Sequence, residues 1–461
     1  MKKNGQMELP PGPSAPPAVQ TMRWWFRPIP MMESCRRRYG DVFSLRLGPG
    51  TPVVMVGDAQ LGKSIVQGDP ALFRAGDTNG LFRPLMGDNS LLVLDGEEHL
   101  RHRRMLLPAF SAGHGQRFGE RVREIVKERV STWEPGQTLN LHDEMEKISF
   151  ESIMRVIYGD EPDERHDALR ELVPEMMDRC DSPFALIPWF HRHLGGISPW
   201  ARVMRVVGEI DENLFEAIRQ RRRDPLTEFR DDVLSLLVRT RHEDGSPLPE
   251  QEIRDELLTL MMAGYETTTG ALAWSLERLM RNPEPMRKLR EELAGDGPGD
   301  YMEATIKEAL RIRPVVPMVA RRLVESQHIG SHTFPAGTVL MVSIYLIHTD
   351  PEVFEDPEEF RPERFLVEDE DQVWIPFGGG TRRCLGASFA QVEMKVALSE
   401  ILSRFELEAV GRRDEDFKRK RFTFSPSRGA AAKVAGRAGE RSRAGGRRFR
   451  VKAPAEGSVP T

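Results

Sequence analysis

One thiol of the chain, that of Cys384, lies in a segment that could make it a metal ligand. Residues 377–386 read FGGGTRRCLG, and the three glycines allow positive φ angles and a close approach to a flat group. Two arginines directly precede the cysteine, and nearby positive charge lowers the pKa of a thiol and favours the thiolate. Because the helix-like run 385–398 follows, a helix dipole would stabilise the negative charge further. The segment therefore predicts a thiolate presented at the start of a helix.

Other interpretations of this cysteine remain open at the level of the single residue. A lone cysteine is more often a small buried apolar side chain. The chain has no CxxC pair for structural zinc, and its glycines are not followed by the GK[ST] of a phosphate-binding loop. A single thiolate suits a metal that another group already holds, and haem iron fits that description.

A second unusual stretch is the middle of a long helix predicted over residues 249–282, where apolar residues recur at three-and-four spacing. Residues 263–270 read AGYETTTG, which places glycines and β-branched residues in a helix interior at a cost of up to roughly 1 kcal/mol each. Small residues would let a planar cofactor and dioxygen lie against the backbone, and threonine hydroxyls could satisfy helix carbonyls. The alternative is helix packing that happens to use small residues.

Two charged pairs lie on predicted helices. His99 and Arg103 are four residues apart on one face of the helix predicted from residue 97 to residue 107, and could bind buried carboxylates. A basic helix face is, however, more often simply solvated. Glu308 and Arg311 are three residues apart, a spacing typical of an exposed pair worth a few tenths of a kcal/mol.

Together these segments resemble the cytochrome P-450 family. Residues 377–386 match FxxGxRxCxG at every defined position, residues 263–268 match AGxETT, and the sequence PERF follows an ExxR pair downstream, as in the family. The resemblance covers roughly residues 35 to 430. It implies a mainly α-helical fold with small β-sheets, in a single domain that holds one haem b.

The resemblance also implies roles for individual residues. Cys384 would bind the haem iron, and Thr267 and Glu266 would be the alcohol and the acid of the proton-delivery pair. Glu308, Arg311 and Arg364 would form a buried salt-bridge network. Many family members have Trp at the position of His99, and Arg322 is a rival for the role of Arg321. The residues expected to contact the haem are His99, Arg103, Ala263, Arg321, Phe377, Arg382 and Gly386.

The implied activity is that of a haem-thiolate monooxygenase. Two externally supplied electrons would activate dioxygen, and a hydrophobic small molecule such as a fatty acid, terpene or steroid would be hydroxylated or epoxidised. No flavin or iron–sulfur segment is visible, so a separate redox partner, a ferredoxin with its reductase, is expected; Arg101, Arg104 and Arg383 could dock an acidic carrier. The alternatives are a haem-thiolate isomerase or peroxygenase that needs no reductase, and a non-enzymatic haem sensor.

Composition and length place limits on the remaining possibilities. The 461 residues carry a formal net charge of -5, which gives no reason to expect nucleic-acid binding. The three cysteines form no disulfide framework, and no apolar run approaches the roughly 18 residues of a membrane span. We therefore expect a soluble, cytoplasmic monomer without a membrane anchor.

The domain organisation is predicted from shifts in composition. Residues 1–22 are a proline-rich extended lead-in, residues 23–430 the catalytic domain, and residues 431–461 a basic, disordered tail. Strands are predicted over residues 42–47 and 51–56. Residues 73–94 are irregular and predict a long loop, which is either a lid over an apolar substrate pocket or a packed surface loop.

Overall fold

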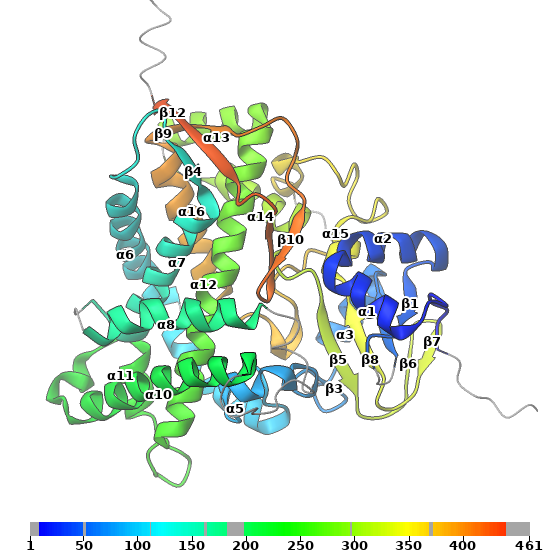
Figure 1. The fold of residues 1–461 in the computed structure, drawn as a ribbon, viewed down its shortest axis with the longest axis horizontal. Coiled ribbons are helices and arrows are strands. Elements are labelled where there is room, and N and C mark those ends of the chain that lie inside the picture. The colour runs from blue at the N-terminus through cyan, green and yellow to red at the C-terminus, as the bar shows by residue number, and fades with distance from the viewer. Residues whose placement is uncertain are drawn as a thin grey trace, which may run out of the picture.

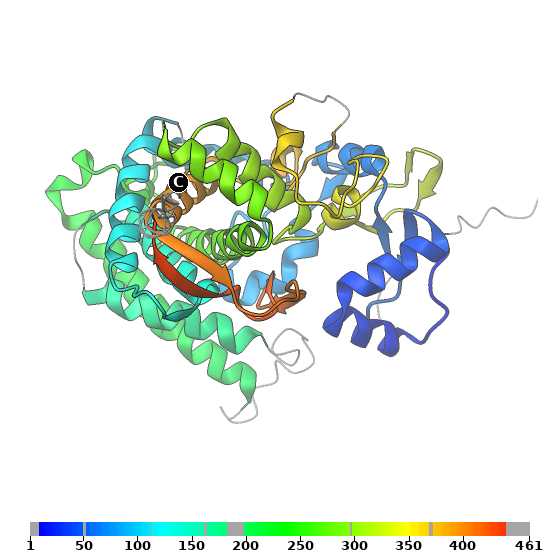
Figure 2. The same cartoon turned by 90° about the horizontal axis from the view of Figure 1, so that it is seen from above.

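The computed structural model describes residues 9–48, 52–110, 112–160, 164–181, 198–295, 297–367 and 372–438. In these residues the fold is mainly helical with small sheets, as predicted (Figure 1). The helices form the larger part of the molecule, and the N-terminal helices and the largest sheet lie to one side of it (Figures 1 and 2).

The long helix α12, Glu250–Arg281, runs through the helical part and confirms the prediction for residues 249–282. Most of its side chains are buried, because other helices pack around it. Its partners include α7, Leu141–Tyr158, along much of its length, and α10, Pro199–Arg223. The remaining helices are α1 Pro17–Phe26, α2 Pro28–Tyr39, α3 Ala59–Gln67, α4 Arg83–Met86, α5 Gly96–Leu106, α6 Ala112–Val130, α8 Glu164–Cys180, α11 Val233–Arg239, α13 Pro283–Ala294, α14 Asp300–Ile312, α15 Ile344–His348 and α16 Ala387–Leu402.

The largest sheet has the strand order β1-β2-β8-β5-β3. Its first two strands, Val42–Leu45 and Val53–Val56, pair antiparallel, and they confirm the strands predicted over residues 42–47 and 51–56. Strand β8, Val339–Val342, joins β2 in parallel and β5, Val319–Leu323, antiparallel. The other strands are β3 Phe73–Arg74, β4 Thr138–Asn140, β6 Gln327–Ile329, β7 His332–Phe334, β9 Phe405–Ala409, β10 Phe417–Lys420, β11 Thr423–Pro426 and β12 Ala431–Arg437.

Both predicted domain ends need correction. Helix α1 begins at Pro17, inside the predicted extended lead-in, because proline is well suited to the first turn of a helix. Residues 431–437, predicted to be part of a disordered tail, form β12 between β4 and β9. Their apolar side chains alternate, with Ala432 and Val434 buried and Lys433 exposed, so the strand has a face to bury despite the surrounding basic residues. The rest of the predicted tail, from residue 439, lies outside the described residues.

The predicted loop at residues 73–94 contains short helices. After β3 come a 3-10 helix, Asp77–Phe82, and α4, while residues 87–94 form turns. Pro84 lies in the first turn of α4, a position that favours helix initiation. Leu85 and Met86 are buried, so this segment is anchored in the core at its middle.

In the part of the chain that the structure describes, every helix is either too short or too polar to cross a lipid bilayer.

Candidate functional site

The loop that carries Cys384 has the conformation its glycines predict, but partly for another reason. Gly378 and Gly380 have φ angles of 69° and 61°. A Cβ on Gly380 would lie 2.6 Å from the carbonyl oxygen of Val66, so the loop needs glycine there in order to pack against α3. At Gly386, by contrast, a Cβ would meet no atom within 4 Å. The backbone is therefore open at Gly386, and the close approach at Gly380 is to the protein itself.

The loop closes on itself beneath the cysteine. The backbone N–H of Cys384 donates a hydrogen bond of 2.9 Å to the carbonyl of Phe377, whose ring makes an edge-on contact with Trp374 at 6.0 Å between centroids. Helix α16 begins at Ala387, three residues after the thiol, as predicted. The sulfur is thus held at the start of a helix by backbone and aromatic contacts.

Two opposing effects act on the pKa of the Cys384 thiol. Burial raises the pKa of Cys384 above its usual value, and it outweighs the backbone N–H of Gly386 and the charges of Arg103 and Arg383, which lower it. Protein groups around the sulfur desolvate it, although part of the residue's surface remains accessible to solvent. The arginines therefore favour the thiolate, as predicted, while desolvation of the sulfur opposes them.

In the middle of α12, one small residue leaves accessible surface, as a planar cofactor would need, and others serve helix packing. Ala263 is exposed, although Met261, Met262 and Tyr265 around it are buried. The Thr267 hydroxyl donates to the carbonyl of Ala263 at 2.8 Å, so a threonine satisfies a helix carbonyl as predicted.

The glycines of this stretch serve packing. A Cβ on Gly264 would lie 2.7 Å from Cδ1 of Ile153 on α7, and one on Gly270 would lie 2.9 Å from Cγ1 of Val315. The helix-packing alternative is thus right for these two glycines, whereas Ala263 keeps an accessible surface.

The carboxylate of Glu266 binds other groups than the hydroxyl of its predicted partner, Thr267. Its carboxylate is buried and accepts hydrogen bonds from the backbone N–H of Phe422, at 3.1 Å, and from the hydroxyl of Thr423, at 2.9 Å. Burial raises the pKa of Glu266 to about 7, although Arg421 and these two donors oppose the rise. The contact with the turn between β10 and β11 was missed, because no local pattern relates residues 266 and 423.

Four residues predicted to bind the cofactor come together from separate elements and form a cationic cluster. They are His99 and Arg103 of α5, Arg321 of β5 and Arg382 of the Cys384 loop. Burial, followed by the charges of Arg382 and Arg103, lowers the pKa of His99 to about 3. Burial, followed by the charge of Arg382, lowers the pKa of Arg321 to about 10. In each case Asp95 is the charge that opposes the shift.

This cationic cluster has one acidic partner in the described residues. Arg382 donates to Asp95 at 2.6 Å and to the carbonyl of Leu91 at 3.1 Å. For Arg103 and Arg321, no carboxylate within the described ranges accepts a hydrogen bond. A buried excess of positive charge is costly unless an anion balances it, so the cluster fits a ligand that carries carboxylates. Arg322 instead binds the carbonyl of Gly337 at 3.2 Å, because successive strand residues face opposite ways.

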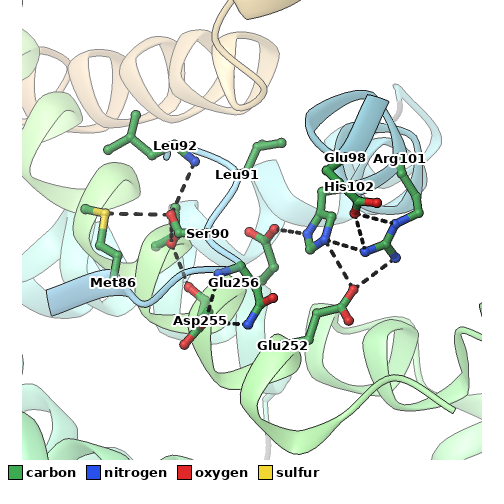
Figure 3. A network of polar contacts seen from close by, with 12 residues as sticks. Met86, Ser90, Leu91, Leu92, Glu98, Arg101, His102, Glu252, Asp255 and Glu256 are labelled. Carbon is green, nitrogen blue, oxygen red and sulfur yellow. Dashed lines mark hydrogen bonds and ion pairs between the residues drawn. The ribbon is translucent and has the colours of Figure 1, made fainter. Parts of the chain in front are cut away.

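A polar network joins the helix of His99 to α12 (Figure 3). Nδ1 of His102 lies 2.6 Å from Glu256, and its Nε2 lies 3.2 Å from Glu252. Arg101 donates to Glu252 at 3.0 Å and to Glu98 at 2.9 Å. Arg101 is therefore engaged within the protein, whereas Arg104 and Arg383, the other two residues expected to dock a redox carrier, are exposed.

The same network binds the segment before α5 to α12. Asp255 accepts a hydrogen bond of 3.1 Å from the backbone N–H of Asn89, and Thr259 donates to the hydroxyl of Ser90 at 2.7 Å. Sequence reasoning missed these contacts. The available signal was a cluster of acidic residues in a helix that is otherwise apolar.

The predicted salt-bridge network is present. Arg311 donates to Glu308 at 2.7 and 2.8 Å, and Arg364 donates to the same carboxylate at 3.2 Å. The side chains of Glu308 and Arg311 are completely buried. Arg311 also binds the carbonyl of His348 at 2.7 Å, so the network joins α14 to α15 and to the PERF segment.

The comparisons with known proteins agree with this geometry. The model of the cytochrome P450 family matches residues 10–431. Putative cytochrome P450 135B1 of Mycobacterium tuberculosis is 37% identical over 440 residues, which are 94% of this chain and 93% of that protein. Putative cytochrome P450 138 of the same organism is 33% identical over 425 residues, 92% and 95% of the two chains.

A solved structure shares the fold. Retinoic acid bound cyanobacterial CYP120A1 superimposes with a TM-score of 0.82 at 22% identity, covering 94% of this chain and all of the other. The family match spans nearly the whole described chain, including the loop of Cys384 and the helix of Thr267. The chain therefore belongs to the cytochrome P450 family, whose members are haem-dependent oxidoreductases that incorporate oxygen from O2 into a substrate.

Proposed function

We propose that the protein is a haem-thiolate monooxygenase that hydroxylates or epoxidises a hydrophobic small molecule, such as a fatty acid, terpene or steroid. The observation that carries the proposal is an exposed thiol at the start of α16 beside a cationic cluster that lacks a full complement of carboxylates. Bound haem b would supply the oxygen-activating iron.

The residues that would hold the haem have complementary chemistry. Cys384 supplies the sulfur ligand, and His99, Arg103, Arg321 and Arg382 supply charged or polar groups for the two propionates. The remaining contacts would be with the porphyrin face, which suits residues that are flat or small. They are Phe377, Ala263 and Gly386.

Proton transfer would fall to Glu266 and Thr267. A carboxyl group with a pKa of about 7 can take up and release a proton near neutral pH, which is the property a general acid needs. The hydroxyl of Thr267 lies beside the accessible surface at Ala263, where it could hold a proton close to the oxygen-binding face. Glu266 would have to leave its contacts with Phe422 and Thr423 to reach it.

The electrons are proposed to come from a ferredoxin and its reductase, and the protein is proposed to act as a cytoplasmic monomer. The alternative of a peroxygenase or isomerase is favoured by one observation, the engagement of Glu266 with the β10–β11 turn. Turnover that needs no reductase would establish this alternative. A non-enzymatic sensor would give no turnover with either system.

The ligation itself can be tested by spectroscopy. The purified protein, reduced under carbon monoxide, is expected to show the red-shifted Soret band of thiolate-bound haem. Cys384→Ser should abolish the band, and Cys35→Ser, a change to a buried cysteine of α2, should leave it intact. Absence of the band from the wild type, or its persistence in Cys384→Ser, would contradict the proposal.

A further inference from the structure

The turn between β10 and β11 holds the carboxylate of Glu266 through a hydroxyl with two possible acceptors. The hydroxyl of Thr423 lies 2.9 Å from Oε1 of Glu266 and 3.3 Å from the carbonyl oxygen of Lys420. One hydroxyl proton can be donated to only one of them at a time. The backbone N–H of Phe422 adds a second donor to Glu266 at 3.1 Å. The hydroxyl of Thr423 can thus donate either to Glu266 or to the carbonyl of Lys420.

The base of this turn is fixed from several sides. Arg421 has a φ of 53°, a conformation uncommon for a residue other than glycine. Its backbone N–H donates to Asp181 at 2.9 Å, and its guanidinium binds Asp178 at 2.8 Å and Glu146 at 2.6 Å. An unfavourable backbone conformation persists only where the surrounding contacts impose it. Arg421 is therefore held in place by these contacts, and the two donors to Glu266 follow it directly in the chain.

The next residue connects the turn to the segment before α5. The ring of Phe422 packs edge-on against Phe82, with centroids 4.8 Å apart and planes at 81°. Phe82 ends the 3-10 helix of the segment 73–94, for which a lid over an apolar substrate is one of the two interpretations. The contact with the segment before α5 and the hydrogen bond to Glu266 thus meet in one residue, Phe422.

We propose that the β10–β11 turn is a latch for the proton-delivery acid. Thr423 and the N–H of Phe422 hold Glu266 away from Thr267, and an apolar ligand that enters between Phe82 and Phe422 releases it. Thr423 is a positioning residue in this scheme. The inference rests on the proposed function, because it gives Glu266 the proton-transfer role, and it adds a means by which substrate occupancy controls that role.

The charged and titratable groups around Glu266 are the same in every variant needed for the test. Arg421 favours its carboxylate and Glu146 disfavours it. The groups bound to Arg421 or adjoining it in the turn complete the set: Tyr265, Asp178, Asp181 and Lys420. A difference between variants at residue 423 therefore reports on the hydroxyl.

The test is a pH titration of the Glu266 carboxyl by infrared difference spectroscopy on the full-length, haem-loaded protein. The band is assigned by its loss in Glu266→Gln. Thr423→Val keeps the side-chain shape but removes the donor, so the midpoint should rise by about one pH unit. Thr423→Ser keeps the hydroxyl and should leave the midpoint unchanged. Thr423→Ala replaces the valine variant if that variant fails to fold.

A second pair of variants tests the connection to the lid. Phe82→Leu removes the aromatic contact with Phe422 and should move the Glu266 midpoint in the same direction by a smaller amount. Phe365→Leu is the matched control, because Phe365 is equally half-buried and its ring contacts Trp374 and Phe354 instead.

Two outcomes would overturn the latch. They are an unchanged midpoint in Thr423→Val, and a shift in Phe82→Leu no larger than in Phe365→Leu. Failure of the carbon monoxide test would sink the monooxygenase proposal without altering the infrared titration, so the two failures can be told apart.

Discussion

Burial raises the pKa of several carboxyl groups of the protein. Glu393 on α16 is one that the proposed reaction does not use. Its side chain is buried against α7, where the hydroxyl of Ser149 lies 2.6 Å away. Burial raises the pKa of Glu393 from 4.5 to about 7, and the hydrogen bond from Ser149 opposes the rise only in part. Ionisation of Glu393 therefore destabilises the folded protein.

A pH dependence of stability follows for Glu393. Between pH 4.5 and about 7 the folded state holds a proton that the unfolded state has lost, so the free energy of unfolding falls as pH rises. The contribution of this group amounts to about 3 kcal/mol at its full extent. The side chain introduced in Glu393→Gln is neutral at every pH, so this variant should lose the pH-dependent contribution of Glu393 to the free energy of unfolding. Urea unfolding at pH 5 and pH 8 measures the effect.

The control for this prediction is Glu212→Gln, at an exposed position on α10. It should keep the pH dependence of the wild type. If the free energy of unfolding decreases equally from pH 5 to pH 8 in Glu393→Gln and in Glu212→Gln, burial of Glu393 does not have the assigned effect.

At the scale of elements, α12 and α7 pack so closely that Gly264 of α12 leaves no room for a side chain against Ile153 of α7. Alanine is the better helix former, and Gly208→Ala, at an exposed position inside α10 with no atom within 4 Å of the new Cβ, should stabilise the protein by up to about 1 kcal/mol. Gly264→Ala places the same methyl group 2.7 Å from Ile153 and should cost about 1–3 kcal/mol instead. Thermal or urea unfolding of both variants measures the difference. Equal effects would mean that Gly264 is not needed for packing.

At the scale of the whole molecule, the cationic cluster exists only because α5, β5 and the loop of Cys384 converge. Arg321 faces this cluster, whereas Arg322 binds the carbonyl of Gly337. Arg321→Ala should therefore speed haem loss by roughly tenfold or more, since a charge-assisted hydrogen bond contributes about 1.5–3 kcal/mol. Arg322→Ala should change the rate little. Haem transfer to apomyoglobin measures both rates, and equal rates would remove Arg321 from the propionate site.

The resemblance of three short segments predicted the helical fold and the family, which are confirmed, and it supplied the residues proposed for the site. These segments carry their information locally: the helix period around Thr267, the glycines around Cys384, and the spacing of Glu308 and Arg311. The limits of the ordered fold were less predictable. Composition suggested a disordered tail from residue 431, whereas the alternation of Ala432, Lys433 and Val434 supports β12.

The amino-acid sequence by itself determined which chemical groups the protein has and in which order its helices and strands follow, because propensity and periodicity act over a few neighbouring residues. Only the tertiary structure decided what those groups do. It turned Glu266 toward Thr423, bound Arg101 to Glu252, and raised the pKa of Cys384 despite its arginines. The reason is physical: burial and contacts between distant segments set charge states and hydrogen bonds, and no local pattern encodes them.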